Sequence, residues 1–204
     1  MSSRAPFVIA YRLATGAVVL AAIVVQFAQG SNAINFFSFF TIEANLFAAG
    51  VFVAGALIRS GVPDGLRGAS VTYMSITGVV YATVLSHQER NADSTIGWVN
   101  LVLHTLMPIV VFLDWLLVPP LHRLRFARSL GWLLVPIAYG TYTLIRGGIV
   151  HWYPYPFLNA ERHSTGQLAL NCVVIVAGGA VFIWVIVLLG NLMRPDRHMA
   201  RAHA

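Results

Sequence analysis

The chain has 204 residues, of which 58% are hydrophobic and only 10% are charged, and its mean hydropathy is +0.74. A soluble domain carries about 25% charged residues, so this composition excludes a water-soluble globular enzyme. The formal charge of +6 arises from 13 basic residues, all of them arginine, against 7 acidic ones. The arginines are scattered between apolar runs, which indicates membrane topology and contact with anionic lipid rather than nucleic-acid binding.

Six stretches are long and apolar enough to cross a membrane as helices, which takes about 17–25 residues. In chain order they cover residues 7–27, 37–58, 69–85, 98–118, 130–145 and 168–189. The first is longer than the apolar core of a signal peptide, about 7–15 residues, so we expect it to be retained as a span. The connections are short and no repeat or soluble segment interrupts them. We therefore expect an all-α polytopic membrane protein, with residues 1–204 forming a single six-transmembrane-helix bundle.

The distribution of arginine predicts the orientation of this bundle. With the N-terminus inside, ten arginines lie on the cytoplasmic side and only Arg90, Arg146 and Arg162 lie outside. The positive-inside rule then predicts a cell-membrane protein with both termini in the cytoplasm. The longest connection, residues 146–167, falls on the outer side. Its aromatic and proline-rich segment, His151–Phe157, is interpreted either as an aromatic belt at the headgroups or as a lid over a site.

Polar residues within the spans concentrate in their outer halves. From the second span onward they are Thr41, Glu43 and Asn45; Thr77 and Tyr81; Asn100 and His104; Tyr142 and Thr143; and Asn171. Uncompensated polar groups are costly in hydrocarbon. The bias therefore predicts a cavity open toward the outer leaflet, although hydrogen bonds between helices would explain part of it.

Two spacings bring particular residues together. Thr41 and Asn45 are four residues apart and share a helix face, as do Asn100 and His104 on the fourth span. At 1.5 Å per residue Thr41 lies about 6–7 Å and His104 about 9 Å below the outer ends of their spans. The two side chains can therefore meet if these helices are neighbours. Pro108 has no N–H for the carbonyl of His104, so we expect a bend there.

Each polar side chain also has a purely structural interpretation. Thr41 could simply donate to the carbonyl of Phe37, four residues earlier, as threonines in membrane helices usually do. Near the inner ends of their spans, Asp114 and Arg12 are expected to form a structural ion pair. The single cysteine, Cys172, excludes an internal disulfide and lies in an apolar run, where we expect a buried, inert thiol.

Four segments, in this order along six spans, resemble the androgen-induced-protein family of multi-pass membrane proteins and its bacterial relatives. They are Phe39–Leu46 (FFTIEANL), Asn100–Pro108 (NLVLHTLMP), Asp114–Leu117 (DWLL) and Tyr155–Leu158 (YPFL). The resemblance covers nearly the whole chain. Animal members of that family are threonine hydrolases that cleave fatty acid esters of hydroxy fatty acids with an intramembrane threonine and histidine.

The resemblance implies that Thr41 is the nucleophile and His104 its general base. A threonine hydroxyl needs a base to take its proton, and histidine titrates near neutrality, so the two residue types suit this chemistry. The supporting or substrate-binding residues are then Asn45, Asn100, Glu43, Tyr81 and Tyr155, although a neutral residue is commoner than glutamate at position 43. The substrate would be a lipid or fatty acid ester held among membrane lipid. We expect no cofactor, metal or nucleic acid, and the sequence names no protein partner.

Other classes of function fit parts of the same pattern. A transporter for a small solute or for protons could use Glu43, His104 and Asp114 as a relay. A zinc hydrolase could draw ligands from four histidines on the outer side, His87, His104, His151 and His163, although none of them are paired on one helix. A structural membrane subunit is a further alternative.

Overall fold

The computed structural model describes residues 5–30, 32–86 and 96–194, and within these ranges every regular element is a helix. Six helical spans are long and apolar enough to cross a membrane: Pro6–Phe27, Phe40–Leu57, Asp64–Leu85, Gly97–Leu117, Phe126–Val150 and Thr165–Met193. The chain is therefore an all-α polytopic membrane protein, as its composition predicts.

Three of the spans are single α-helices and three are composite. The single helices are α1 (Pro6–Phe27), α3 (Phe40–Leu57) and α9 (Thr165–Met193). The third span joins α4 (Asp64–Val80) to the π-helical turn η1 (Tyr81–Leu85). The fourth joins α5 (Gly97–Leu101), the π-helical turn η3 (Val102–Leu106) and α6 (Met107–Leu117). The fifth joins α7 (Phe126–Ser129), η4 (Leu130–Leu133) and α8 (Leu134–Val150).

Several boundaries differ from the predicted ones by three to five residues. The second span begins at Phe40 rather than at residue 37, because a separate short helix, α2 (Ala33–Phe36), precedes it. The third span begins at Asp64, five residues earlier than predicted. The fifth continues to Val150, so Arg146 lies on α8 instead of opening the outer loop. In the third and fifth spans the helix continues into residues that are too polar for an apolar window to include.

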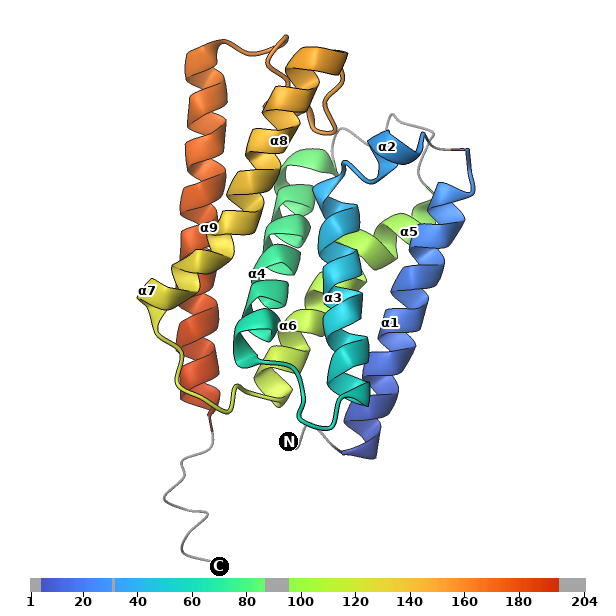
Figure 1. The fold of residues 1–204 in the computed structure, drawn as a ribbon, viewed down its shortest axis with the longest axis vertical. Helices are drawn as coiled ribbons and strands as arrows, with labels where there is room; N and C mark the ends of the chain where they lie inside the picture. The colour runs from blue at the N-terminus through green and yellow to red at the C-terminus, as the bar shows by residue number, and fades with distance from the viewer. Residues whose placement is uncertain (1–4, 31, 87–95, 195–204) are drawn as a thin grey trace, which may run out of the picture.

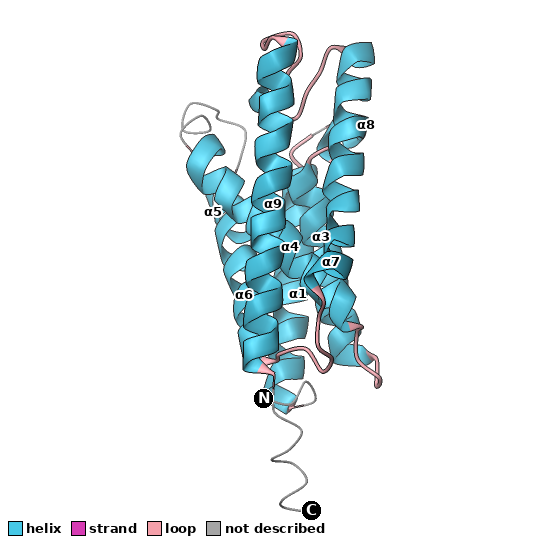
Figure 2. Cartoon of the chain, turned by 90° about the vertical axis from the view of Figure 1, so that its left-hand side faces the viewer, coloured by secondary structure: helices cyan, strands magenta, loops and turns pink. Residues whose placement is uncertain are grey.

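Consecutive spans run in opposite directions, so α1 begins and α9 ends at the same end of the bundle (Figure 1). We call this the termini end and the opposite one, where η1 and α8 finish, the loop end. Helix α4 packs against α3, α6 and α9, and α1 packs against α3. Figure 2 shows α8 and α9 side by side, with α5 leaning away from them at the other side of the bundle.

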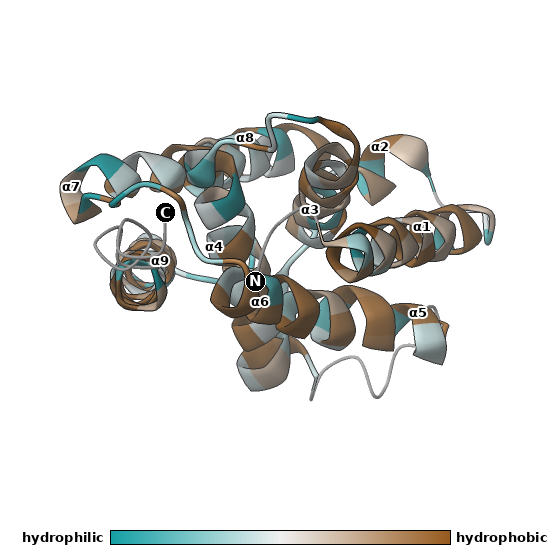
Figure 3. Ribbon diagram, turned by 90° about the horizontal axis from the view of Figure 1, so that it is seen from below, coloured by the Kyte–Doolittle hydropathy of each residue, from teal (hydrophilic) through white to brown (hydrophobic). Residues whose placement is uncertain are grey.

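The outward faces of the helices are apolar. Large hydrophobic side chains remain exposed on every side, among them Val24 on α1, Ile145 on α8 and Val173 on α9. Viewed along the bundle, hydrophobic residues predominate in α1, α6 and α9, while α8 carries more hydrophilic ones (Figure 3). Such a surface is stable against hydrocarbon rather than water, because lipid tails offer it the same apolar surroundings as a protein core.

A charged cluster lies inside the termini end. The guanidinium of Arg12 donates to both carboxylate oxygens of Asp114, at 2.7 and 3.0 Å, which confirms the predicted ion pair. Arg67 joins it at 3.0 Å from the first turn of α4, and the Tyr11 hydroxyl also donates to Asp114. The arginine count assigned Arg67 to the cytoplasmic side, but its side chain turns into the bundle and donates to the Val118 carbonyl as well.

Candidate active site

Thr41 and His104 meet near the loop end of the bundle. Thr41 belongs to the first turn of α3, and His104 to the π-helical turn η3. The Thr41 Oγ1 atom lies 3.2 Å from Nε2 of His104, and only 6% of Thr41 is exposed. The predicted contact is therefore present, and the alternative of a Thr41 hydroxyl bound to the carbonyl of Phe37 is not the arrangement found.

The second ring nitrogen of His104 determines which way the proton of Thr41 points. Nδ1 lies 3.3 Å from the backbone carbonyl oxygen of Asn100. A carbonyl can only accept, so in the neutral ring Nδ1 carries the hydrogen and Nε2 keeps a lone pair. The Thr41 hydroxyl then donates to Nε2, which is the polarity that a general base requires. A backbone carbonyl thus takes the orienting role for which the sequence offers no aspartate.

Two further predicted residues hold the imidazole in place. The ring of Tyr81 stacks on that of His104, with centroids 4.3 Å apart and planes inclined by 23°. The side-chain amide of Asn100 donates to the Tyr81 hydroxyl at 2.6 Å. Asn100 therefore supports His104 twice, directly through its carbonyl and indirectly through Tyr81.

Asn45 connects α3 to the turn that carries His104. Its Nδ2 donates to the carbonyls of Thr41, at 2.8 Å, and Leu103, at 3.0 Å. In η3 the N–H of Met107 donates to the carbonyl of Val102, five residues earlier. With the same spacing, the carbonyl of Leu103 would accept from the N–H of residue 108. That residue is a proline and has no N–H. The sequence predicted that Pro108 would free the carbonyl of His104. In the π-helical register the carbonyl of Leu103 faces Pro108 as well, and the side chain of Asn45 donates to it instead.

Tyr155 completes the surroundings of Thr41 from the connection between α8 and α9. Its hydroxyl lies 3.2 Å from the backbone N of Thr41 and 3.3 Å from Oγ1. The N–H of Thr41 is among the first four of α3, which have no acceptor within the helix, and the helix dipole places partial positive charge there. Burial raises the pKa of the Tyr155 phenol, so this group stays a neutral hydrogen-bond donor.

Aromatic contacts fix the Tyr155 connection against the start of α3. The rings of Tyr155 and Phe157 stack with centroids 5.3 Å apart, and Asn171 on α9 donates to the Phe157 carbonyl at 2.8 Å. On the other side, Tyr139 of α8 donates to the Ser38 carbonyl at 2.9 Å. The segment predicted as either an aromatic belt or a lid therefore covers the site through Tyr155.

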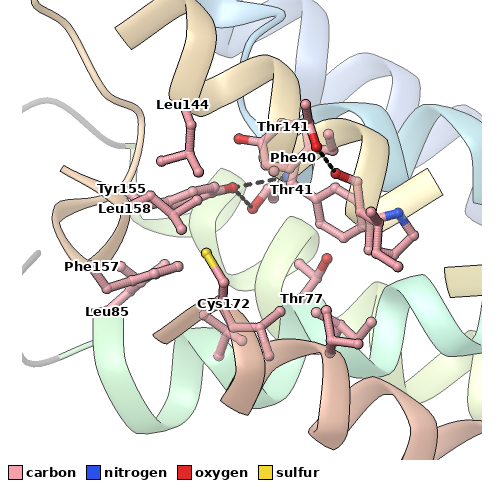
Figure 4. A pocket seen from close by; sticks show the side chains of 18 residues that line it. Phe40, Thr41, Thr77, Leu85, Thr141, Leu144, Tyr155, Phe157, Leu158 and Cys172 are labelled. Atoms are coloured by element: carbon pink, nitrogen blue, oxygen red, sulfur yellow. Dashed lines mark hydrogen bonds between the residues drawn. The ribbon is translucent and has the colours of Figure 1, made fainter. Parts of the chain in front are cut away.

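An apolar cavity of about 200 Å³ lies beside Thr41 and is lined by residues of α3, α4, α8, α9 and the connection that carries Tyr155. Figure 4 shows the hydroxyl of Tyr155 joined to Thr41 at its edge, with Thr77 and Cys172 on the facing wall. His104 is not among the residues that line it, because Thr41 lies between the imidazole and the cavity. Cys172, predicted to be fully buried, is half-buried and lines this cavity.

The remaining predicted residues lie elsewhere. Glu43 is exposed and lines a second cavity of about 440 Å³, between α3, α4 and the start of α8. Asp114 is ten residues beyond His104, about 15 Å along the helix, and its carboxylate is occupied by two arginines and Tyr11. The described part of the chain thus shows no continuous relay of Glu43, His104 and Asp114.

The histidines proposed as zinc ligands are also dispersed. His151 contacts Glu161 at 2.6 Å, and His163 lies 3.1 Å from the Pro156 carbonyl. His87 lies outside the described residues. In residues 5–30, 32–86 and 96–194, no group of three or more His, Cys, Asp or Glu side chains is arranged to hold a metal ion.

No protein-family model, curated protein or solved structure matches this chain.

Proposed function

We propose that this protein is an intramembrane hydrolase of lipid esters, in which Thr41 is the nucleophile and His104 the general base. The observation that carries the proposal is the line of contacts from Thr41 Oγ1 to Nε2 of His104 and from Nδ1 to the carbonyl of Asn100. This is the arrangement of a nucleophile, a base and a group that orients the base. It agrees with the threonine hydrolases that the sequence resembles.

In the first half-reaction the Thr41 oxygen attacks the ester carbonyl carbon while its proton passes to Nε2 of His104. The carbonyl oxygen becomes an oxyanion, which needs preorganised donors. The backbone N–H of Thr41 and the hydroxyl of Tyr155 both lie at the nucleophile. Asn45 and Asn100, predicted as supporting or substrate-binding residues, donate instead to the carbonyls of Thr41 and Leu103 and to the Tyr81 hydroxyl. Thr41 N–H and the Tyr155 hydroxyl bond to each other in the free protein, and we propose that the ester carbonyl oxygen takes up both donors when substrate binds.

In the rest of the cycle the leaving group departs, and water then returns the enzyme to its starting state. His104 gives its proton to the leaving alkoxide as the carbon–oxygen bond of the ester breaks, which leaves an acyl group on Thr41. A water molecule then attacks the acyl carbonyl and passes a proton to His104. Collapse of this intermediate releases the fatty acid, and Thr41 regains its proton. No cofactor or metal takes part in any step.

The cavity and the resemblance both support a proposal for the substrate class. Its lining is mostly aliphatic and aromatic, with Ile76, Leu144, Phe157 and Ile175 among its walls, so an acyl chain fits better than a polar group. We propose a fatty acid ester of a hydroxy fatty acid as the substrate, reached from the surrounding lipid. The loop end would then face outward and both termini the cytoplasm of the cell membrane.

Hydrolysis of such esters by the purified protein in detergent tests this proposal. Thr41→Ala and His104→Ala should each abolish turnover, and the double variant should be no worse than either, because the pair acts as a unit. Thr41→Ser keeps the hydroxyl and should retain part of the activity. Thr141→Ala is the matched control, since Thr141 lines the same cavity but donates to its own helix at the Ile137 carbonyl. Activity that survives Thr41→Ala would refute the assignment.

A further inference from the structure

Thr77 places a polar atom without a partner in the wall of the cavity. The residue is 5% exposed, and its Oγ1 has no hydrogen-bond partner among the described residues. It lines the cavity from α4, on the wall opposite Tyr155 (Figure 4). A buried hydroxyl that lacks a partner is costly, so this position calls for a partner that the described residues do not supply.

Three other helical threonines satisfy their hydroxyls within their own helices, whereas Thr143 on α8 also lacks a partner among the described residues but does not line this cavity. Thr72 donates to the Gly68 carbonyl at 2.9 Å and Thr83 to Val79 at 2.7 Å. Thr141, which lines the same cavity as Thr77, donates to Ile137 at 2.9 Å. This bond to the carbonyl four residues earlier is the usual one for a threonine in a membrane helix. Thr41, which contacts His104, and Thr77 are the two cavity threonines that do not form it.

The position of Thr77 relates it to the proposed nucleophile. Thr77 precedes Tyr81 by one helical turn, about 6 Å, and Tyr81 stacks on His104. The hydroxyl of Thr77 therefore lies about one turn deeper than the level of His104, toward the termini end. Its neighbours along this part of the cavity are apolar: Ile76, Pro136, Ile137 and Val176. An acyl chain whose carbonyl sits at Thr41 would pass Thr77 within its first carbons.

We propose that the cavity selects an acyl chain that carries a hydroxyl or keto oxygen close to its carboxyl end, and that Thr77 is the residue that recognises this oxygen. The placement of the ester carbonyl at Thr41 rests on the proposed function, whereas the binding of an oxygenated acyl chain in the cavity beside Thr77 does not. An oxygen at the right carbon exchanges a hydrogen bond with Thr77, while the rest of the chain contacts the apolar walls. A plain chain leaves the hydroxyl of Thr77 unsatisfied.

Binding is measured first, on the Thr41→Ala protein in detergent, by displacement of a fluorescent fatty acid. The competitors are palmitic acid and its monohydroxy positional isomers. One isomer, or two adjacent ones, should bind about 3- to 10-fold more tightly than palmitic acid, which is the effect of one net hydrogen bond. Adding Thr77→Val should remove this preference and Thr77→Ser should keep it. Adding Thr141→Val, the matched control, should leave it unchanged.

Hydrolysis by the otherwise unaltered protein gives an independent measurement. Thr77→Val should lower kcat/KM for the preferred hydroxylated ester by the same factor and leave the plain ester unchanged. An equal loss on both esters would overturn the inference and assign Thr77 to the chemistry or to the fold, which thermal unfolding distinguishes. Equal binding of all isomers would also overturn it, as expected if water satisfies Thr77. A binding preference without any hydrolysis would refute the proposed function but not the role of Thr77.

Discussion

Tyr81 and His104 stack face to face, and each lies in a π-helical turn of a different span. A π-helical turn accommodates an extra residue and is often found at functional sites. Just below the stack α4 and α6 approach closely, since a Cβ atom at Gly78 would lie 3.0 Å from Cβ of Pro108. The two irregular turns therefore meet where the helices are in close contact, and the imidazole is held between Tyr81 and Thr41.

Removal of the Tyr155 hydroxyl tests the proposed oxyanion donor. Tyr155→Phe keeps the ring and its stack on Phe157 but loses both contacts with Thr41. We expect kcat to fall about 10²- to 10³-fold, the usual cost of one oxyanion donor, with little change in KM. Because burial raises the pKa of Tyr155, the wild-type phenol should remain a donor up to at least about pH 10, the ordinary tyrosine value.

Tyr142→Phe provides the control for that variant. The Tyr142 hydroxyl contacts Ser38 Oγ at 3.0 Å and has no contact with Thr41 among the described residues. Its loss should change kcat by no more than a few fold. Equal losses in the two variants would mean that Tyr155 only supports the start of α3.

Asn45 should be needed for both stability and activity. Asn45→Ala leaves the carbonyl of Leu103 without its donor, at a cost on the order of 1–3 kcal/mol, and also removes the side-chain bond to the carbonyl of Thr41. It also releases the connection that sets the distance from Thr41 to His104. We expect a lower thermal unfolding temperature in detergent and at least a ~10-fold loss of kcat, since about 1.4 kcal/mol is tenfold in rate.

Asn191 is the matched residue at the termini end. Its side-chain amide makes two hydrogen bonds to the backbone of Leu124, far from Thr41. Asn191→Ala should lower the unfolding temperature while kcat of the folded protein stays unchanged. If both variants lose activity only in proportion to the folded fraction, Asn45 has no role in positioning the site.

The charged cluster at the termini end is expected to stabilise the fold and not the reaction. Asp114→Asn leaves Arg12 and Arg67 buried beside a neutral amide. Breaking a buried ion pair in this way costs about 3–5 kcal/mol, which thermal unfolding in detergent measures. Glu161→Gln, in an exposed pair with His151, should have little effect on the unfolding temperature. A proton-relay role for Asp114 would require loss of function without loss of stability.

The orientation in the membrane has its own test. A reporter fused after Arg201 should be cytoplasmic, and a tag inserted at Asn159, in the connection between α8 and α9, should be accessible from outside. The reason is the excess of arginine at the termini end. External accessibility of the C-terminus would reverse the side from which substrate and water reach Thr41.

The sequence predicted those features that depend on composition and helical spacing. Apolar stretches of sufficient length located the six spans. Residue spacing placed Thr41 and His104 at nearly the same depth below the outer ends of their spans, and the two side chains are in contact. The pair of Arg12 and Asp114 followed from the cost of isolated charges in hydrocarbon.

Other features depend on contacts between distant segments and could not be predicted in this way. The π-helical turns could not be predicted, because five residues within a mostly apolar span are too short to show a period of their own. Arg67 was counted as a surface charge, since nothing in its local sequence shows that Asp114 accepts a second guanidinium. The contact of Tyr155 with Thr41 requires that the connection after α8 fold back over α3. Thr77 was noted as polar, but whether its hydroxyl has a partner is visible only in three dimensions.

The central claim is that His104 makes Thr41 a nucleophile, and covalent labelling tests it most directly. The purified protein is treated with a fluorophosphonate probe, and the modified residue is located by peptide mass spectrometry. We predict one adduct on Thr41, absent from Thr41→Ala and strongly reduced in His104→Ala, while Thr141→Ala labels like the unaltered protein. Absence of any adduct on Thr41 in folded protein, or undiminished labelling of Thr41 in His104→Ala, would contradict the account.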